Sequence, residues 1–358
     1  MTGTGLRQTQ RRSQNEVLSY PTLGFKKLLW LSKNRSYFRL DGIKNINIKV
    51  KSAYPVISAY EFEFLKELDE IQELLSESTI YFIVQRPLIY FNKLHIDKGI
   101  VKYEISDMNG NPPLTGSLDP YIAGFAREGE SYFFTANLYT GSAQDKTSLD
   151  YVSSFAIETD SREHLAWITP QKIIHLSVMG IDGYALDGNI NNYIDYRVHY
   201  IGQAFNRDIW SRLTGHEKMQ SILTREELFD HKANRNSFEI ALILMEITGF
   251  SETQMVPFES WMLQGSTKPI LHNLQGDSFS SFCSPFIDTD DQSLTNEVEA
   301  LLVNNFQPEY NIIKFKKYPD IANGTRSKGY TMATLQIEYS PVTFETDFHK
   351  IEPIFIRQ

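Results

Sequence analysis

The sequence predicts an α+β protein with more than one domain. The chain has 358 residues, about twice the usual size of a single domain. Runs rich in β-branched and aromatic residues alternate with segments whose apolar residues recur at helical spacing. With 41% hydrophobic and 22% charged residues, the chain can bury a sizeable core without disulfides or structural metals.

The first half is predicted to be a mostly-β or α+β accessory module, residues 56–168, that follows an N-terminal arm. In the segment Glu61–Ser76, apolar residues recur at helical spacing and acidic residues take the other face, which predicts a helix. Strands are expected where apolar runs are separated by turn residues, at Thr79–Val84, Leu88–Phe91, Ile100–Ile105, Tyr132–Leu138 and Tyr151–Ile157.

The second half, residues 169–358, is predicted to be another α+β domain. Alternating patterns predict strands at Lys172–Met179 and Asp195–Gln203, and one or two closing strands within Tyr330–Phe344. Helices are expected at Asp208–Leu223 and Leu294–Phe306, whereas the apolar run Phe238–Ile247 fits a strand or a helix.

Charge is distributed unevenly along the chain. The net charge is −9, yet residues 1–55 contain eleven lysines and arginines against two acidic residues. A basic arm, or a basic start of the first domain, on an acidic body suits phosphate contact through one face. A solvated N-terminal tail is the alternative interpretation.

Cysteine usage and hydropathy point to a cytoplasmic protein. The single Cys283 excludes an internal disulfide framework and a cysteine-rich zinc site, and fits a reducing compartment. No apolar stretch approaches the roughly 18 residues needed to cross a bilayer, so no membrane association is expected.

Five features of the second half suggest chemistry when they are taken together. The expected strand at 195–203 contains Tyr200-Ile201-Gly202, and the next helix carries Arg212 and His216 on one face. The last helix contains Glu299 and runs into Pro308-Glu309-Tyr310-Asn311. Each feature alone has an ordinary structural explanation: a glycine turn, a solvated pair, a capping box from Asn296 to Glu299, and a helix-stopping turn.

In this order the features resemble the GIY-YIG nuclease family over roughly residues 172–320. The resemblance implies a small antiparallel sheet of three strands flanked by helices. It also implies one divalent metal ion, Mg²⁺ or Mn²⁺, and hydrolysis of phosphodiester bonds in nucleic acid, with DNA expected rather than RNA. An insertion near residues 225–290 must be accommodated between the arginine and the glutamate.

The resemblance also implies a role for each residue. Tyr200 would orient or activate the attacking water, and Arg212 would clamp the phosphate with its planar, always protonated guanidinium. Glu299 would bind the metal, since a carboxylate is a hard ligand that suits Mg²⁺. Asn311 would fix the end of the site, and His216 is an alternative base because its pKa is ordinarily near neutrality.

The first motif of the family, Gly-Ile-Tyr on the opening strand, does not occur as such. Gly183-Tyr184 is the nearest substitute, and Tyr193 and Tyr196 are alternatives for the partner tyrosine. A catalytically inactive module that binds nucleic acid or protein is therefore the chief rival to a nuclease. A chance match in a structural or interaction protein is the third interpretation.

Helical geometry distinguishes the two neighbouring glutamates of the last helix. At about 100° per residue, Glu299 lies at the edge of the apolar stripe, where a metal or arginine partner would offset its burial. Glu297 lies on the opposite flank and is expected to be a first-turn residue that favours the helix dipole.

Overall fold

The structure is a computed structural model. It describes residues 43–53, 56–58, 61–62, 65–127, 131–139, 148–204, 222, 238–255, 291–318, 321–330 and 332–354. The chain divides into two compact units, and every described residue except Met255 belongs to the unit formed by Ile43–Gln254 and Pro285–Gln358. The expected N-terminal arm lies mainly outside the described residues.

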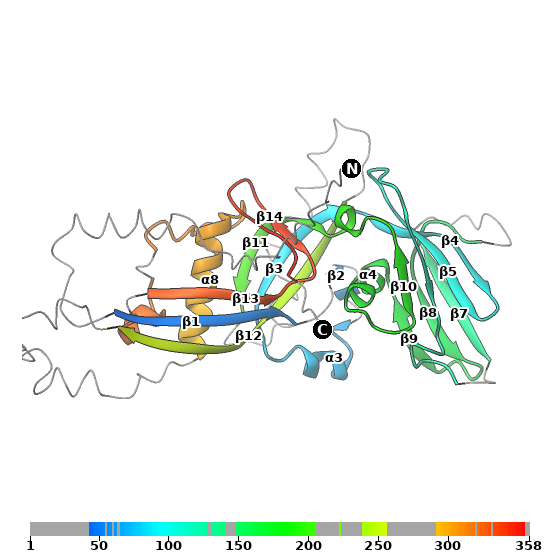
Figure 1. The fold of residues 1–358 in the computed structure, drawn as a ribbon, viewed down its shortest axis with the longest axis horizontal. Helices are drawn as coiled ribbons and strands as arrows, with labels where there is room; N and C mark the ends of the chain where they lie inside the picture. Colours follow the sequence, from blue (N-terminus) through cyan, green and yellow to red (C-terminus); the bar gives the residue numbers. More distant parts are fainter. Residues whose placement is uncertain are drawn as a thin grey trace, which may run out of the picture. The chain divides into compact units, whose positions relative to one another are not determined.

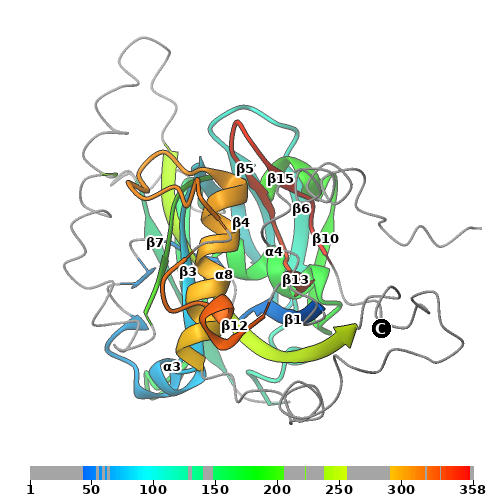
Figure 2. The same ribbon diagram turned by 90° about the vertical axis from the view of Figure 1, so that its left-hand side faces the viewer.

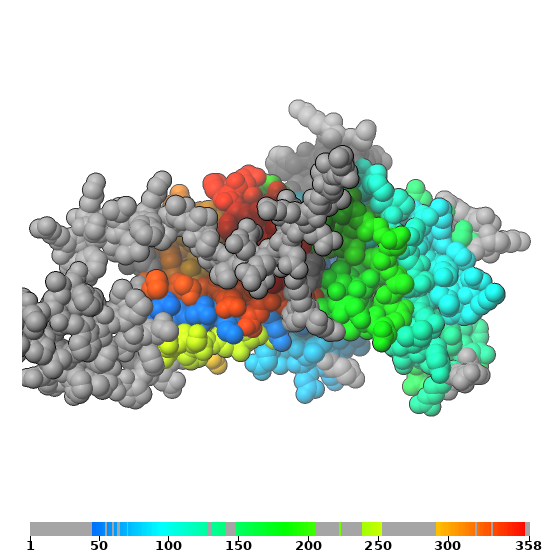
Figure 3. Space-filling model, viewed as in Figure 1, coloured from blue at the N-terminus to red at the C-terminus, as the bar shows by residue number. Residues whose placement is uncertain are grey.

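In the described residues, the first of two sheets has eight strands in the order β13-β1-β12-β3-β11-β14-β15, with β2 paired to β12. The strands are β1 (Ile43–Ser52), β2 (Ile57–Ser58), β3 (Ser78–Pro87), β11 (Asp195–Gln203), β12 (Phe238–Met255), β13 (Met332–Tyr339), β14 (Thr343–Glu345) and β15 (Lys350–Ile351). β3 is antiparallel to both of its neighbours, β11 and β12. Figure 3 shows the atoms of β12, β1 and β13 side by side on one face.

The second sheet has seven strands in the order β10-β6-β5-β4-β8-β7, with β9 paired to β8. The strands are β4 (Ile89–Asp97), β5 (Ile100–Asp107), β6 (Leu114–Leu118), β7 (Tyr132–Leu138), β8 (Val152–Thr159), β9 (His164–Ile168) and β10 (Tyr184–Asp187). Only Leu88 separates β3 from β4, so a single segment passes from one sheet into the other (Figure 1). The whole second sheet is thus inserted between β3 and β11, which are hydrogen-bonded neighbours.

The helical segments among the described residues are few. They include α3 (Asp69–Leu74), α4 (Pro170–Val178), α8 (Asp291–Phe306) and the 3₁₀ segments η1 (Ile190–Tyr193) and η4 (Thr325–Lys328). No helix in the described ranges is both long and apolar enough to cross a membrane.

Alternate residues of β3 belong to two different apolar clusters. Ile80, Phe82 and Val84 pack in the cluster that contains the apolar residues of α8, and Figure 2 shows α8 beside β3. The ring of Phe82 stacks on Phe344 at 4.7 Å between centroids and meets Phe306 of α8 edge-on at 6.2 Å. Tyr81 and Ile83 point the other way, into a second cluster. The period of two in a strand produces this division, and β3 is buried on both faces from Ile80 to Val84.

The strand expected at Lys172–Met179 is wrong, because this segment forms the helix α4. The Oγ1 of Thr169 accepts a hydrogen bond from the Lys172 amide, and Pro170 occupies the first turn. Both features favour a helix start, and they outweigh the strand preference of the β-branched pair Ile173-Ile174.

Most of the other expected elements are confirmed, but the expected helix Glu61–Ser76 is interrupted at residues 66–68, and α3 covers only Asp69–Leu74. The strand Tyr132–Leu138 has the expected bounds, the strand at 195–203 is β11, and the ambiguous run Phe238–Ile247 is part of the long strand β12. The expected helix Asp208–Leu223 lies outside the described residues except for Ile222, which is helical.

Strands from both sides of the domain boundary expected at residue 168 lie in one sheet. β1 and β3 come from the first half of the chain and lie in one sheet with β11 to β15 of the second half. Two lysines of the expected basic arm, Lys49 and Lys51, lie in β1, where they pair with Glu338 at 2.8 Å and Glu246 at 2.7 Å. These two lysines are therefore neutralised within the sheet.

Candidate functional site

The Tyr200-Ile201-Gly202 motif lies near the end of β11, against β3. In the antiparallel register Gly202 is opposite Tyr81, and the rings of Tyr81 and Tyr200 are 6.0 Å apart with an interplanar angle of 34°. A Cβ atom on Gly202 would lie 2.5 Å from the Tyr81 ring and 2.7 Å from the Tyr200 ring. Glycine is required here because the two aromatic rings occupy the space of a side chain.

Tyr310 and Asn311, in the turn after α8, form hydrogen bonds with the same segment of β11, along the edge opposite to β3. The Asn311 side chain accepts a hydrogen bond from the Ile201 amide at 3.0 Å and donates one to the Ile201 carbonyl at 2.7 Å. The Tyr310 amide donates to the His199 carbonyl at 3.1 Å. The turn therefore takes the place of a neighbouring strand, and it brings together two motifs that are 110 residues apart in sequence.

Glu299 lies in the middle of α8, the helix that contacts both β11 and β3. It is partly buried. Thr295, one turn earlier on the same face of α8, donates a hydrogen bond to Thr79 at 3.4 Å. α8 packs in the cluster that contains Ile80 and Phe82, whereas Tyr81 and Tyr200 pack in the other cluster, so α8 and the two tyrosine rings lie on opposite faces of β3.

The expectation for Glu297 is wrong, because its side chain is fully buried. The Tyr318 hydroxyl donates to one carboxylate oxygen at 2.7 Å, the Thr325 amide donates to the other at 3.1 Å, and Arg326 lies 3.7 Å away. Since α8 begins at Asp291, Glu297 is beyond the first turn and cannot stabilise the helix end.

The alternative role of Glu299 in a capping box is also excluded. Asn296 lies inside α8 rather than at its start, and its side-chain amide donates to the Asn323 carbonyl at 3.1 Å. An N-cap residue must precede the first turn of the helix. The carboxylate of Glu299 is thus not used to cap α8.

Arg212 and His216 lie outside the described residues. The one described residue of their segment, Ile222, is fully buried in the cluster that contains Tyr81 and against which Tyr200 packs. Ile222 therefore lies on the face of β3 and β11 on which the two tyrosines lie.

The three tyrosines proposed as partners of Tyr200 lie elsewhere. Tyr184 belongs to β10 of the seven-stranded sheet, its ring meets Phe125 edge-on at 6.4 Å, and desolvation raises its pKa to about 12. Tyr193 donates its hydroxyl to the Pro112 carbonyl, and Tyr196 is buried beneath Arg86. None of the three lies against the Tyr200 ring.

The tyrosine whose ring lies against that of Tyr200 is Tyr81 of β3, which no complete motif in the sequence singles out. Thr79-Ile80-Tyr81 differs from Gly-Ile-Tyr only in its first residue, and it lies on the strand that pairs antiparallel with Tyr200-Ile201-Gly202. The tripeptide was visible in the sequence within an expected strand. It was overlooked because more than a hundred residues, including a complete sheet, separate it from β11.

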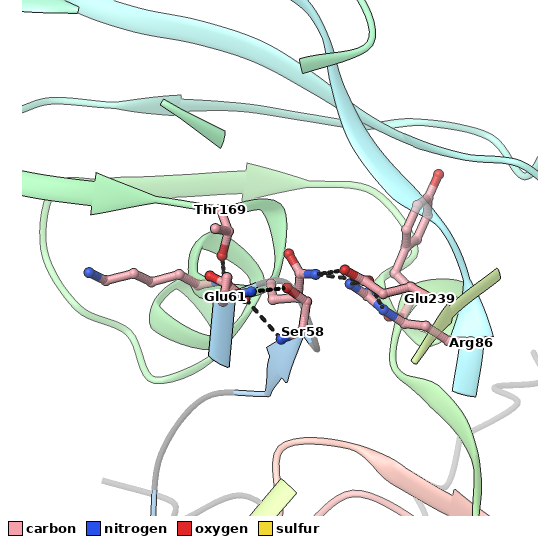
Figure 4. A network of polar contacts seen from close by, with 8 residues as sticks. Ser58, Glu61, Arg86, Thr169 and Glu239 are labelled. Atoms are coloured by element: carbon pink, nitrogen blue, oxygen red, sulfur yellow. Dashed lines mark hydrogen bonds and ion pairs between the residues drawn. The ribbon is translucent and has the colours of Figure 1, made fainter. Parts of the chain in front are cut away.

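A second polar cluster lies where β3 leaves the eight-stranded sheet. Arg86 donates to Glu239 at 2.7 and 3.1 Å, and Gln171 of α4 donates to both oxygens of Glu239 at 2.8 Å. Figure 4 shows this pair beside Glu61, whose carboxylate accepts a hydrogen bond from the Ser58 amide at 3.0 Å. These hydrogen bonds tie β2, β3, β12 and α4 together, while the Oε1 of Gln171 is buried and accepts no hydrogen bond from the described residues.

The sequence predicts a metal site with one protein carboxylate, Glu299. No group of three or more His, Cys, Asp or Glu side chains that could hold a metal ion occurs in the described ranges. Mg²⁺ keeps several of its waters and needs only one or two carboxylates. Glu299 is the carboxylate of α8 on the side that faces Thr79.

The fold and the site define an α+β protein with two sheets in which two distant motifs meet at β11. Comparison with protein families, with curated proteins and with solved structures finds no match to this chain.

Proposed function

We propose that the chain is a metal-dependent endonuclease that hydrolyses phosphodiester bonds in DNA. The observation that carries the proposal is the pair of hydrogen bonds between Asn311 and Ile201, which unites the Tyr-Ile-Gly and Pro-x-Tyr-Asn motifs. The three adjacent antiparallel strands β12, β3 and β11 further support it, since the resemblance to GIY-YIG nucleases implies such a set.

Each side chain has a distinct role in the proposed reaction. Arg212 holds two oxygens of the scissile phosphate as negative charge grows in the transition state. Tyr200 orients the attacking water through its hydroxyl, and His216 is the alternative base. Glu299 would hold the Mg²⁺ or Mn²⁺ ion, which polarises the phosphate and assists the leaving oxygen.

Two further residues position Tyr200 without touching the substrate. Tyr81 is fully buried, so its ring supports the ring of Tyr200 from within the sheet. Asn311 is also buried and uses its amide group to hold the backbone of Ile201. Tyr81 is therefore the partner tyrosine that the sequence left open, in place of Tyr184.

The test is cleavage of plasmid DNA, single-stranded DNA and RNA with Mg²⁺ or Mn²⁺. Glu299→Gln and Arg212→Ala are expected to reduce cleavage by at least about a hundredfold, the order of effect seen when a transition-state contact is removed. Glu163→Gln and Arg162→Ala, in the exposed turn between β8 and β9, are the matched controls and should cleave as the parent does. Cleavage that survives both site substitutions would place the reaction elsewhere.

A module that binds nucleic acid without cutting it is the second candidate. Thr79 in place of the motif's glycine favours this alternative, because a side chain now stands at the start of the partner motif. The candidates differ in one result: the binding module retains DNA without cleaving it under any metal, and Glu299→Gln does not change its affinity.

A further inference from the structure

The segment Ile312–Tyr318, which directly follows Asn311, presents an unusual surface. Two consecutive apolar side chains, Ile312 and Ile313, are 83% and 67% exposed. Single exposed apolar residues are common on proteins, but two adjacent ones on a loop indicate an interaction site. The segment lines a shallow hollow of about 540 Å³.

The backbone of this segment is fixed by side chains from the end of α8. Asn304 donates to the Phe315 carbonyl at 2.9 Å, and Gln307 donates to the Lys314 carbonyl at 3.2 Å. Lys314 returns a hydrogen bond to the Gln307 carbonyl at 3.3 Å. The loop that carries the two isoleucines is therefore fixed at Lys314 and Phe315, which reduces the ordering that binding requires.

The charge around the isoleucines is positive. Lys314, Lys316 and Lys317 lie within six residues of Asn311, and the segment contains no acidic residue. Lys316 and Lys317 are exposed, and neither forms an ion pair with any part of the chain that the structure describes. The nearest acidic residues in sequence are Glu309, before Asn311, and Asp320, after Tyr318. On a chain of net charge −9, this local excess of lysine indicates an anionic partner.

We propose that residues 312–318 form a wedge that deforms duplex DNA beside the scissile phosphate. Ile312 and Ile313 insert at a base step from the minor groove, as apolar side chains do in proteins that kink DNA, and Lys316 and Lys317 contact the flanking phosphates. The proposal rests on the nuclease site, since Asn311 joins this wedge directly to Ile201 next to Tyr200. The substrate is accordingly a duplex that is kinked at the cut.

The test measures DNA binding and bending without divalent metal, so that it does not depend on cleavage. A 20-base-pair duplex labelled at both ends reports the bend by energy transfer, and fluorescence anisotropy reports affinity. The parent chain should bind and bend the duplex. The double variant I312A/I313A should lose the bend and bind at least about tenfold more weakly, because the six methyl and methylene carbons that it lacks no longer pack against the bases.

The contribution of Lys316 and Lys317 is measured separately, by the salt dependence of DNA affinity. K316A/K317A should lower the slope of log affinity against log salt by about 2, since each lost phosphate contact removes about 0.9. I96A/I122A and K98A/K102A are matched controls from the seven-stranded sheet and its neighbouring turn, where Ile96 and Ile122 are 53% and 58% exposed. These controls should leave bending and the salt slope unchanged.

Several results would refute the proposal that residues 312–318 deform duplex DNA. One is a parent chain that does not bend the duplex, and another is an I312A/I313A variant that bends it as the parent does. A parent that binds phosphatidylserine vesicles but not DNA would show that the surface is membrane-directed. Cleavage with an unchanged bend in I312A/I313A would refute the wedge alone, whereas bending without cleavage under any metal would refute the nuclease alone.

Discussion

Asn311 and Ile201 are joined by two hydrogen bonds through which one side chain replaces a missing strand. Beyond Arg197, β11 has no partner in β14, whose register covers only Asp195 to Arg197. The amide of Asn311 satisfies both the N–H and the C=O of Ile201, which would otherwise be unpaired in a buried position. The position of Tyr200, the residue before Ile201, thus depends on Asn311, which is 110 residues further along the chain than Ile201.

The first prediction concerns this contact. Asn311→Ala should destabilise the protein by about 2–3 kcal/mol, because it leaves a buried N–H and C=O of Ile201 without partners. Urea unfolding measures the loss, and faster hydrogen exchange at the Ile201 amide localises it. Asn305→Ala, at an exposed position of α8, is the control and should change stability by less than about 0.5 kcal/mol. A small effect of Asn311→Ala would mean that water satisfies β11 equally well.

The second prediction concerns the close approach at Gly202. Gly202→Ala places a Cβ atom within 2.5 Å of the Tyr81 ring, so the two strands must separate or the ring must move. We expect a loss of about 1–3 kcal/mol in the free energy of unfolding, as for other overpacked sites. In a Tyr81→Ala background the same substitution should cost clearly less. Equal costs in both backgrounds would contradict the assignment of Tyr81 to this space.

The third prediction separates the two glutamates of α8. Glu297→Gln should lower stability by about 2–4 kcal/mol, since an acceptor that faces the Tyr318 hydroxyl or the Thr325 amide becomes a donor and Arg326 loses its charge partner. Glu299→Gln should act on cleavage and lower stability by less than Glu297→Gln does, because Glu299 is only partly buried. Thermal unfolding and DNA cleavage, measured on the same preparations, give both readouts. A strong loss of stability in Glu299→Gln would show that this carboxylate has a structural role.

The sequence predicts the strands well because their signal is local. The run of aromatic and apolar residues at Tyr132–Leu138, bounded by turn residues, has the bounds of β7. The helix α4 was mistaken for a strand because two adjacent isoleucines outweighed the start signals of Thr169 and Pro170. Those start signals are equally local, so a search for helix caps would have found the helix.

The candidate site is less predictable because its contacts are distant in sequence. The Tyr200 motif and Asn311 were identified by their order along the chain, but the pairing of Gly202 with Tyr81 follows from strand register. When a complete sheet is inserted between β3 and β11, no periodic pattern in the sequence shows which of their residues pair. Glu297 was misjudged for a similar reason: helical periodicity identifies one apolar stripe, whereas Tyr318 and Thr325 return from further along the chain to cover a second side of α8.

The fourth prediction concerns the dependence of stability on pH. Desolvation, opposed by the hydrogen bond from the Ser58 amide, raises the pKa of Glu61 from 4.5 to about 7. The folded protein therefore binds this proton more tightly than the unfolded chain does. The resulting stabilisation is complete below about pH 4.5 and is lost as the pH rises to about 7. Because the side chain is only partly buried, we expect a loss on the order of 2 kcal/mol.

Glu61→Gln removes this titration and keeps an acceptor for the Ser58 amide. The variant should gain stability relative to the parent between pH 4.5 and 7 and keep a constant advantage above that range, as measured by urea unfolding at each pH.

The variants must be compared with the parent at the same pH, because His175 also titrates in this range and acts in the opposite direction. Desolvation lowers the pKa of His175 from 6.5 to about 4, so the stabilisation from His175 is lost as the pH falls between these values. Ser58→Ala removes the hydroxyl that accepts from the Glu61 amide and that also lowers the pKa of the Glu61 carboxyl. It should lower stability at every pH, and by more at pH 7 than at pH 4.5. Parallel pH profiles for Glu61→Gln and the parent would show that the Glu61 carboxyl titrates normally in the folded protein.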